Sequence, residues 1–162
     1  MNKNKTLFIV DDDNIYLKAI EKEIKSSGNY NVLTFSSVEE CLEKIGLNPD
    51  IVILDYYLNS TNAKAINGLS VLDKIKEHKP KTHVIMLSGQ DRIEVVVSCM
   101  KHNASDYIVK SETAFVRLKR SISAILNNIK LEKENYLYKR IWLFSISTVT
   151  LVTTISIFFY FI

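Results

Sequence analysis

Short apolar runs alternate along the chain with longer amphipathic stretches, which is the pattern of alternating strands and helices. The expected strands lie at Thr6–Asp11, Tyr30–Phe35, Asp50–Asp55, His83–Ser88 and Ser105–Lys110. The expected helices lie at Asn14–Ser27, Ser37–Gly46, Asn67–His78 and Asp91–His102, with a long one opening near Thr113. Their alternation predicts an α/β fold with a five-stranded parallel sheet, doubly wound by helices on both faces.

The helical segments carry apolar positions at helical spacing. The first has Ile15, Leu17, Ile20 and Ile24, and the last has the stripe Phe115, Leu118, Ile122, Ile125 and Ile129. A stripe spaced three and four residues apart is typical of one buried helix face. We expect the last stripe to pack on the sheet or on its copy in a homodimer. Because neither Gly nor Pro occurs from Thr113 to Ile162, this helix can run on without a break.

Four of the expected strands end in residues with useful chemistry. Asp11-Asp12-Asp13 follows the first strand, Asp55 ends the third, Ser88 the fourth and Lys110 the fifth. The carboxyl ends of parallel strands meet in one crevice, where ligands bind. We therefore expect several carboxylates, a hydroxyl and an ammonium group to share one site.

Such a site is suited to phosphoryl transfer. Clustered carboxylates repel one another unless a cation joins them, and Mg²⁺ takes hard oxygen ligands shared between a few carboxylates and phosphate oxygens. Asp55 is the expected nucleophile, because aspartate carboxylates form covalent phosphoryl intermediates. Lys110 and the metal would neutralise charge on the transferring phosphoryl group, and Ser88 would hydrogen-bond one of its oxygens.

From Lys5 to Asn128 the order and spacing of these motifs resemble the receiver domain of two-component response regulators. The resemblance implies a flavodoxin-like fold and a set of roles for matching residues. Asp11 and Asp12 match the acidic pair that binds Mg²⁺, Asp55 the phosphoacceptor and Tyr57 the residue whose backbone carbonyl completes the metal shell. Ser88 and Lys110 match the hydroxyl and lysine that contact the phosphoryl group. Tyr107 matches the aromatic switch that swings inward, and Asp13 would be an accessory acid.

The chain departs from the family pattern beside the site. Asp55-Tyr56-Tyr57-Leu58 lacks the Pro that usually follows the phosphoacceptor, and Gly68 comes later than in the family. Residues 60–65 are therefore expected to be an insertion that alters partner docking. Lys110 is followed by Ser111 where the family has a Pro with a cis bond, and a cis bond before Ser costs roughly 3–4 kcal/mol. The isomer of this bond stays open in the sequence.

The charge balance and the two cysteines bear on which partners and which compartment we expect. With 21 basic and 18 acidic side chains the chain is nearly neutral, so we expect no nucleic-acid partner. Cys41 and Cys99 lie far apart without metal-ligand spacing, which favours two buried thiols in a reducing compartment. Met1–Thr6 is polar and is not followed by a long apolar run, so no secretory signal is expected.

The carboxyl-terminal segment predicts a membrane span. Ile141–Ile162 has 22 residues without a charge, although seven are Ser or Thr. As a helix it would extend roughly 33 Å, enough for a hydrocarbon core of about 30 Å. Lys139 and Arg140 precede it, which predicts a cytoplasmic amino-terminal domain and a tail-anchored, single-pass protein of the inner or plasma membrane. A buried helix of a globular domain is the alternative.

These observations predict three parts: a receiver domain at 1–128, a basic juxtamembrane linker at 129–140 and a transmembrane helix at 141–162. The expected function is a membrane-tethered receiver, itself not an enzyme, that is phosphorylated on Asp55 by a histidine kinase or phosphotransfer protein. It would assist its own phosphorylation and dephosphorylation and would signal to an unidentified downstream protein. The rival is a receiver-like adaptor or dimerisation module that is not phosphorylated. A phosphatase of the haloacid-dehalogenase type would need a second Asp where Tyr57 stands, so we discount it.

Overall fold

The computed structural model describes residues 4–58 and 66–160, without the side chains of 66, 67, 149 and 151–159. It divides into two compact units, 1–123 and 124–162, which are described separately. Whether the receiver domain ends at residue 128 stays a prediction. The strands are β1 (Thr6–Val10), β2 (Asn31–Phe35), β3 (Ile51–Asp55), β4 (Tyr57–Leu58), β5 (Ile66–Asn67), β6 (His83–Ser88) and β7 (Asp106–Val109). The helices are α1 (Asn14–Ser27), α2 (Val38–Lys44), the 3-10 turn η1 (Ile45–Leu47), α3 (Gly68–His78), α4 (Ile93–Lys101) and α5 (Ala114–Tyr160).

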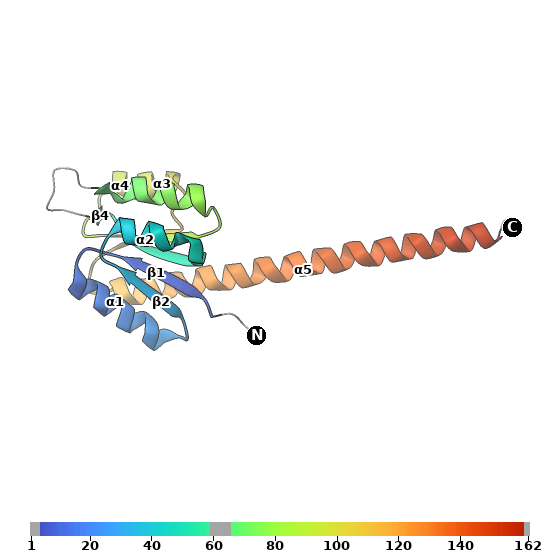
Figure 1. The fold of residues 1–162 in the computed structure, drawn as a ribbon, viewed down its shortest axis with the longest axis horizontal. Coiled ribbons are helices and arrows are strands. Elements are labelled where there is room, and N and C mark those ends of the chain that lie inside the picture. The colour runs from blue at the N-terminus through green and yellow to red at the C-terminus, as the bar shows by residue number, and fades with distance from the viewer. Residues whose placement is uncertain (1–3, 59–65, 161–162) are drawn as a thin grey trace. The chain divides into compact units, whose positions relative to one another are not determined.

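Five of the strands form one parallel sheet in the order β2-β1-β3-β6-β7 (Figure 1). Counted along the chain, these five strands follow the order 2-1-3-4-5, which is that of flavodoxin-like folds. The predicted α/β fold with a five-stranded parallel sheet is confirmed. The order reverses between β1 and β3, and a crevice at the carboxyl ends of the strands is expected at such a reversal.

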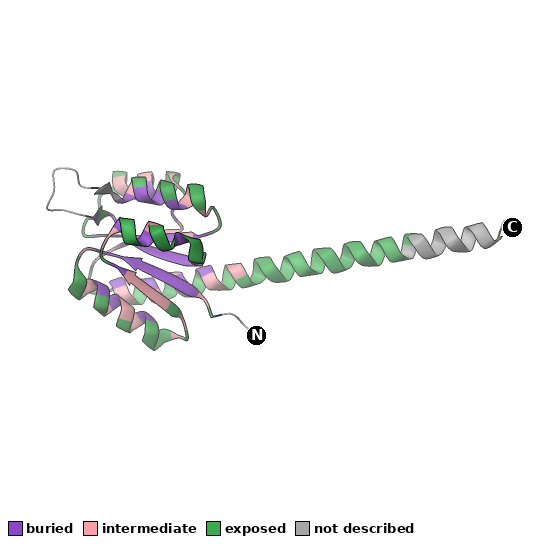
Figure 2. Cartoon of the chain, viewed as in Figure 1, coloured by how far each residue is buried: buried purple, intermediate pink, exposed green. Residues whose placement is uncertain are grey.

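The sheet is buried on both faces, which explains why its strands read as continuous apolar runs. All residues of β1 and β3 are buried, and Figure 2 shows the same for most of the sheet. Alternate side chains of a strand point to opposite faces. Phe8 and Val10 belong to a core with buried side chains of α2, α3 and α4. The neighbouring positions are left to face α1 and the start of α5, whose buried side chains are Leu17, Ile20, Ile24, Ala114, Leu118 and Ile122.

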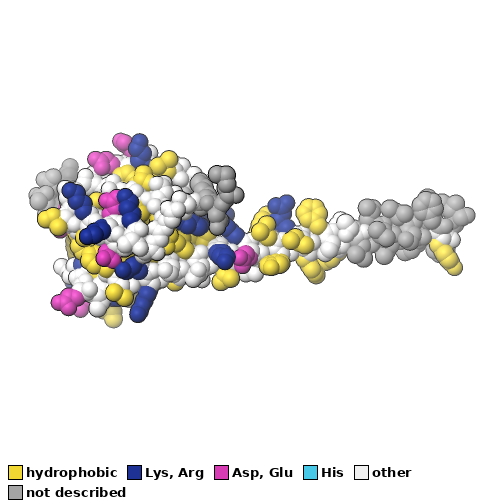
Figure 3. Space-filling view, turned by 90° about the horizontal axis from the view of Figure 1, so that it is seen from below, with side chains coloured by type: hydrophobic (Ala, Val, Ile, Leu, Met, Phe, Trp, Pro, Cys, Tyr) yellow, Lys and Arg dark blue, Asp and Glu magenta, His cyan; other side chains and the backbone are white. Residues whose placement is uncertain are grey.

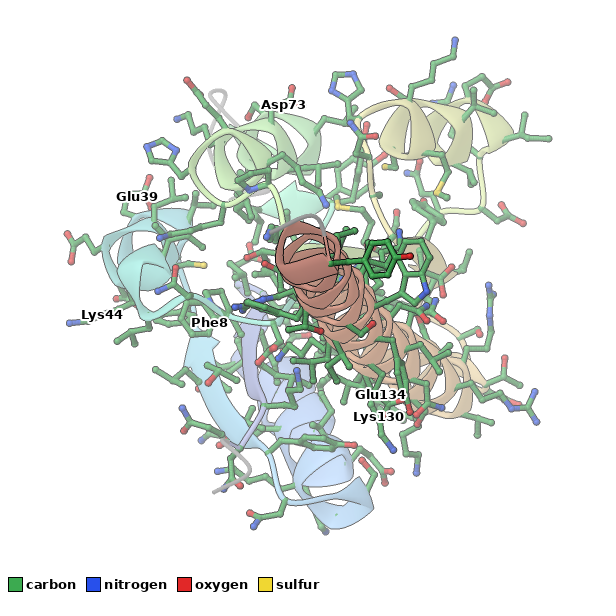
Figure 4. The ribbon with its side chains drawn as sticks, turned by 90° about the vertical axis from the view of Figure 1, so that its right-hand side faces the viewer. Phe8, Glu39, Lys44, Asp73, Lys130 and Glu134 are labelled. Atoms are coloured by element: carbon green, nitrogen blue, oxygen red, sulfur yellow. The ribbon has the colours of Figure 1, made fainter. Side chains whose placement is uncertain are left out.

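The helix ends follow from local chemistry. Asp13 and Ser37 accept hydrogen bonds from the first turns of α1 and α2, as expected of N-cap residues. Figure 4 shows Glu39 and Lys44 on the outer side of α2, near opposite ends of the helix. This placement suits the helix dipole, which favours acidic residues in the first turn and basic residues in the last.

Some local predictions differ from the structure. Ile15, expected on the buried face of α1, is 83% exposed. With about 3.6 residues per turn it lies on the opposite side of the helix from Leu17, Ile20 and Ile24. The helix expected at Asp91 begins at Ile93, because its N-cap Arg92 has an extended backbone. Cys41 and Cys99 are buried free thiols, as predicted.

The second unit contains the continuation of α5. Lys130 and Glu134 lie one turn apart with charged atoms at 3.9 Å (Figure 4), and a surface pair of this kind contributes only a few tenths of a kcal/mol, roughly. Several large apolar side chains of this unit are exposed: Leu131, Tyr136, Leu137, Tyr138, Ile141, Trp142, Leu143, Phe144 and Ile146.

The predicted membrane span is not supported. Judged over the described part of the chain, none of the helices has the length and apolar character that a membrane crossing requires. The expectation of a span at Ile141–Ile162, and of a membrane-anchored location, was therefore wrong. It rested on length and absence of charge and gave little weight to the seven Ser and Thr. Residues 161–162 and the side chains of 149 and 151–159 lie outside the described residues.

Candidate functional site

The site lies at the carboxyl ends of the central strands. Asp11 directly follows β1, and Asp55 is the last residue of β3, so the two aspartates flank the point where the strand order reverses. Ser88 ends β6, and Lys110 follows β7 at the edge of the sheet. The topology thus brings four predicted residues from distant parts of the sequence to one end of the sheet.

Lys110 connects the two central strands to the sheet edge. Its backbone N–H donates to the carbonyl of Ser88 at 2.7 Å, which fixes the start of its side chain. Its Nζ donates to Asp11 Oδ2 at 2.8 Å and forms an ion pair with Asp55 Oδ1 at 3.1 Å. No cis peptide bond occurs among the described residues, so the Lys110–Ser111 bond is trans. Lys110 therefore reaches both carboxylates without the cis bond that is usual in the family.

The carboxylates form a compact group. One oxygen from each of Asp11, Asp12 and Asp55 lies within 4.8 Å of the others. Asp11 is fully buried, and its Oδ1 accepts the backbone N–H of Asp13 at 3.0 Å, which orients the carboxylate. Hard oxygen donors this close together fit a divalent cation such as Mg²⁺. Lys110 pairs with two of these carboxylates, and a divalent cation would offset more of their negative charge.

The Asp13 carboxylate makes hydrogen bonds within the first turn of α1. Its Oδ1 accepts the backbone N–H groups of Ile15 at 2.9 Å and Tyr16 at 3.2 Å. These bonds make Asp13 the N-cap of α1. Asp13 thus holds the first turn of the helix beside the acidic pair, and its role as an accessory acid stays a prediction.

Burial has the largest effect on the pKa of Asp55. The carboxyl is 4% exposed, and this burial raises its pKa to about 6, although Lys110 acts in the opposite direction. For Lys110, burial lowers the pKa, but the hydrogen bond to Asp11 and the charge of Asp55 outweigh burial and raise it. Lys110 thus stays an ammonium, while Asp55 is ionised at neutral pH and becomes protonated in mildly acidic solution.

Gln90 joins three other residues around the site, a role that the sequence did not predict. Its backbone N–H donates to Ser88 Oγ at 3.2 Å, and its carbonyl accepts the hydroxyl of Tyr107 at 2.7 Å. Its side-chain Oε1 accepts the hydroxyl of Tyr57 at 2.9 Å. Tyr107 is only 6% exposed, so its ring already lies inside in this structure. The predicted inward swing of Tyr107 would therefore have to start from another conformation.

Tyr16 is the second neighbour that sequence reasoning missed. Its ring centroid lies 4.7 Å from Lys110 Nζ, and the ring stacks on that of Phe115 at 5.7 Å. No periodicity or motif marks Tyr16, because the contact depends on how α1 and α5 meet beside the sheet. Only the position of Tyr16, in the first turn of the helix after the acidic residues, could have suggested that it lies near the site.

Two short strands, β4 and β5, lie between Asp55 and α3. The predicted insertion at 60–65 lies outside the described residues, but β4 and β5 on either side of it pair antiparallel. Gly68 follows at once, and its N–H donates to the Tyr56 carbonyl at 2.9 Å. A Cβ at Gly68 would lie 2.7 Å from the backbone oxygen of Asp55, so only glycine fits this close approach. The role of the Tyr57 carbonyl as a metal ligand stays a prediction.

Comparisons with known proteins agree with this architecture. The sequence profile of the response regulator receiver domain matches residues 7–123. A putative response regulator of Rickettsia typhi, NtrX-like, is 32% identical over 133 residues, which are 80% of this chain and 26% of that protein. A cyclic di-GMP phosphodiesterase of Thermotoga maritima is 31% identical over 105 residues, 65% of this chain and 27% of that protein. The crystal structure of a receiver domain from Clostridium thermocellum is 30% identical with a TM-score of 0.68, and it covers 78% of this chain and 98% of that one.

The matches to the curated relatives cover only a small part of each relative's length. The chain spans about a quarter of the length of the first curated relatives it matches, 27% and 26% for the two named above. Each match therefore concerns only part of the relative's length. Activities named for the relatives as whole proteins therefore do not transfer with the match.

Proposed function

The chain belongs to the response regulator receiver domain family, and we propose that it accepts a phosphoryl group on Asp55 from a histidine kinase or a phosphotransfer protein. Receiver domains are signalling modules that bind Mg²⁺ at an acidic pocket. One observation carries the proposal for this chain: Lys110 Nζ contacts both Asp11 and Asp55, and Asp12 lies in the same carboxylate group. This arrangement combines a nucleophile with the positive charge that phosphoryl transfer requires.

In the proposed reaction an oxygen of the ionised Asp55 attacks the phosphorus of a phosphohistidine. The O–P bond forms as the P–N bond of the donor breaks, and the electron pair of that bond stays on the imidazole nitrogen. No oxidation or reduction occurs. Lys110 stabilises the negative charge of the phosphoryl oxygens, and Ser88, fully buried at the end of β6, donates a hydrogen bond to one of them.

Asp11, Asp12, Asp55 and the Tyr57 carbonyl would hold Mg²⁺, with Asp12 as the more direct acidic ligand. The bound ion supplies positive charge that offsets the carboxylates and the incoming phosphoryl group. The fit rests on the spacing of the three carboxylates.

Phosphorylation would change the contacts of Ser88, Gln90 and Tyr107. Because one Gln90 residue bonds both Ser88 and Tyr107, a shift of the Ser88 hydroxyl toward a phosphoryl oxygen would disturb the Tyr107 contact as well. The next helix along the chain after Gln90 is α4. Ile93, Val97 and Met100 are exposed on one side of α4, at spacings of four and three residues. We propose this apolar face as the surface that responds to phosphorylation, for a downstream protein or a second copy.

Electrostatics of the first unit do not point to nucleic acid. On the face seen in Figure 3, basic and acidic side chains are interspersed rather than gathered into one basic patch. This agrees with the near balance of 21 basic and 18 acidic residues. We therefore propose protein partners, without a nucleic-acid partner.

Labelling of the full-length chain tests the proposal. The protein is incubated with acetyl phosphate and Mg²⁺, and its intact mass is compared with that of Asp55→Asn. We expect the wild-type chain to gain one phosphoryl group, and we expect no gain in the variant or in the presence of a chelator. A folded wild-type chain that binds Mg²⁺ but gains no mass would contradict the proposal and favour the adaptor.

A further inference from the structure

The ammonium group of Lys110 has an aromatic neighbour in addition to its two carboxylates. Nζ lies 4.7 Å from the centroid of the Tyr16 ring. A cation within about 6 Å of a ring centroid is attracted to the negative face of the π system. Lys110 is about one-fifth exposed at its side chain, so solvent screens this attraction less than at an open surface.

Tyr16 is itself held in place from two directions. Its backbone N–H donates to the Asp13 carboxylate at 3.2 Å, in the capped first turn of α1. Its ring stacks on Phe115, the second residue of α5, with an angle of 26° between the planes. The backbone and the ring are therefore both fixed, and the ring offers Lys110 a rigid surface.

This rigidity matters because a lysine side chain is long and loses much rotamer freedom when it is fixed. Charge that is already in position at the reacting group needs no reorganisation during the reaction. We propose that Tyr16 is a positioning residue for Lys110: its ring, stacked on Phe115, holds the ammonium at Asp55 ready for the incoming phosphoryl group. This inference rests on the proposed function of Asp55.

A purely structural role for Tyr16 makes a different prediction. If the side chain only filled space between α1 and α5, any apolar residue of similar size would replace it. If its π face holds Lys110, Tyr16→Phe keeps the phosphorylation rate and Tyr16→Leu lowers it. Ile15, next to it on α1 and 83% exposed, offers the control Ile15→Ala.

The first measurement is the initial rate of phosphorylation of the full-length chain by acetyl phosphate with Mg²⁺. We expect Tyr16→Phe and Ile15→Ala to stay within about twofold of wild type. Tyr16→Leu should be slower by about 2-fold to 30-fold, which corresponds to the range of cation–π attractions. Equal rates for Tyr16→Leu and Tyr16→Phe, with both proteins folded, would overturn the proposal.

The second measurement does not depend on phosphorylation. In the chain labelled with ¹³C-lysine, the ε-methylene protons of Lys110 should show an upfield ring-current shift, assigned by its loss in Lys110→Arg. The shift should persist in Tyr16→Phe and vanish in Tyr16→Leu. A wild-type spectrum without it overturns the positioning role even if the chain is phosphorylated. Conversely, a wild-type chain that shows the shift but gains no phosphoryl group would contradict the proposed function and leave the contact with Lys110 established.

Discussion

At the scale of single residues, Asp55 is buried, and burial disfavours the negatively charged form of its carboxyl. Burial raises its pKa to about 6, above the value of about 3.9 for an aspartate in an unfolded chain. The folded state therefore prefers the protonated form. The stability that this preference contributes is fully present below about pH 3.9 and is lost as the pH rises through about 6.

Asp55→Asn removes this penalty, and we expect the variant to be more stable than wild type at pH 7. Two pKa units correspond to up to about 3 kcal/mol, and the gain should shrink toward zero near pH 4. The difference in stability is measured by urea unfolding of both proteins at pH 7 and pH 4 in the presence of a chelator. If the variant were less stable than wild type at pH 7, the contact of Asp55 with Lys110 would outweigh the cost of burial.

The sequence could predict site residues at strand ends, but not residues that reach the site only through tertiary contacts. Asp11, Asp55, Ser88 and Lys110 could be placed in one crevice because each ends a strand of a parallel sheet. Their catalytic and switching roles remain predictions. Gln90 could not be selected in advance, since its contacts arise only when β4, β7 and the segment after β6 come together.

At the scale of elements, the loop between β3 and α3 depends on one close approach. Gly68, the first residue of α3, lies against the backbone of Asp55 and Tyr56, and a Cβ there would be 2.7 Å and 2.8 Å from backbone atoms that cannot rotate away. Gly46, in η1, is the matched control, because a Cβ added there would meet no atom within 4 Å.

We expect Gly68→Ala to lower the free energy of unfolding by about 1–3 kcal/mol, as other overpacking substitutions do, and to slow labelling of Asp55. Gly46→Ala should change neither quantity noticeably. Thermal unfolding and intact-mass labelling of both variants make the test. Equal behaviour of the two alanine variants would show that the loop yields without cost.

The five parallel strands and their helices could be predicted because buried strands give continuous apolar runs and the helices give stripes spaced three and four residues apart. The pair β4 and β5 could not, since strands of two residues have no periodicity. Gly68 appeared only as a late glycine in the family pattern. Its reason, the approach to the Asp55 carbonyl, is visible only in three dimensions.

At the scale of the whole molecule, a ligand that binds only the folded state stabilises it in proportion to the logarithm of its concentration. Mg²⁺ should therefore raise the melting temperature of the wild-type chain, with a gain of about 2.7 kcal/mol at a hundred times its dissociation constant. Asp12→Asn should reduce the response at every Mg²⁺ concentration. Asp13→Asn should keep it, because asparagine caps a helix as well as aspartate does. A weakened response in Asp13→Asn would return Asp13 to the metal site.

The largest error of prediction also belongs to this scale. A run of 22 uncharged residues predicted a membrane span, whereas the described helices include none that could cross a membrane. Absence of charge and sufficient length were given more weight than the seven Ser and Thr of that segment. The sheet, in contrast, could be predicted because many strands and helices specify it together.

The proposed function depends above all on Asp55, among three neighbouring carboxylates, being the residue that receives the phosphoryl group. The decisive experiment reduces the phosphorylated full-length chain with borohydride, which converts a phosphoaspartate to homoserine, and locates that residue by peptide mass spectrometry. We expect homoserine at position 55 and unmodified aspartates at 11 and 12. Homoserine at Asp11 or Asp12, or phosphorylation that persists in Asp55→Asn, would contradict the assignment.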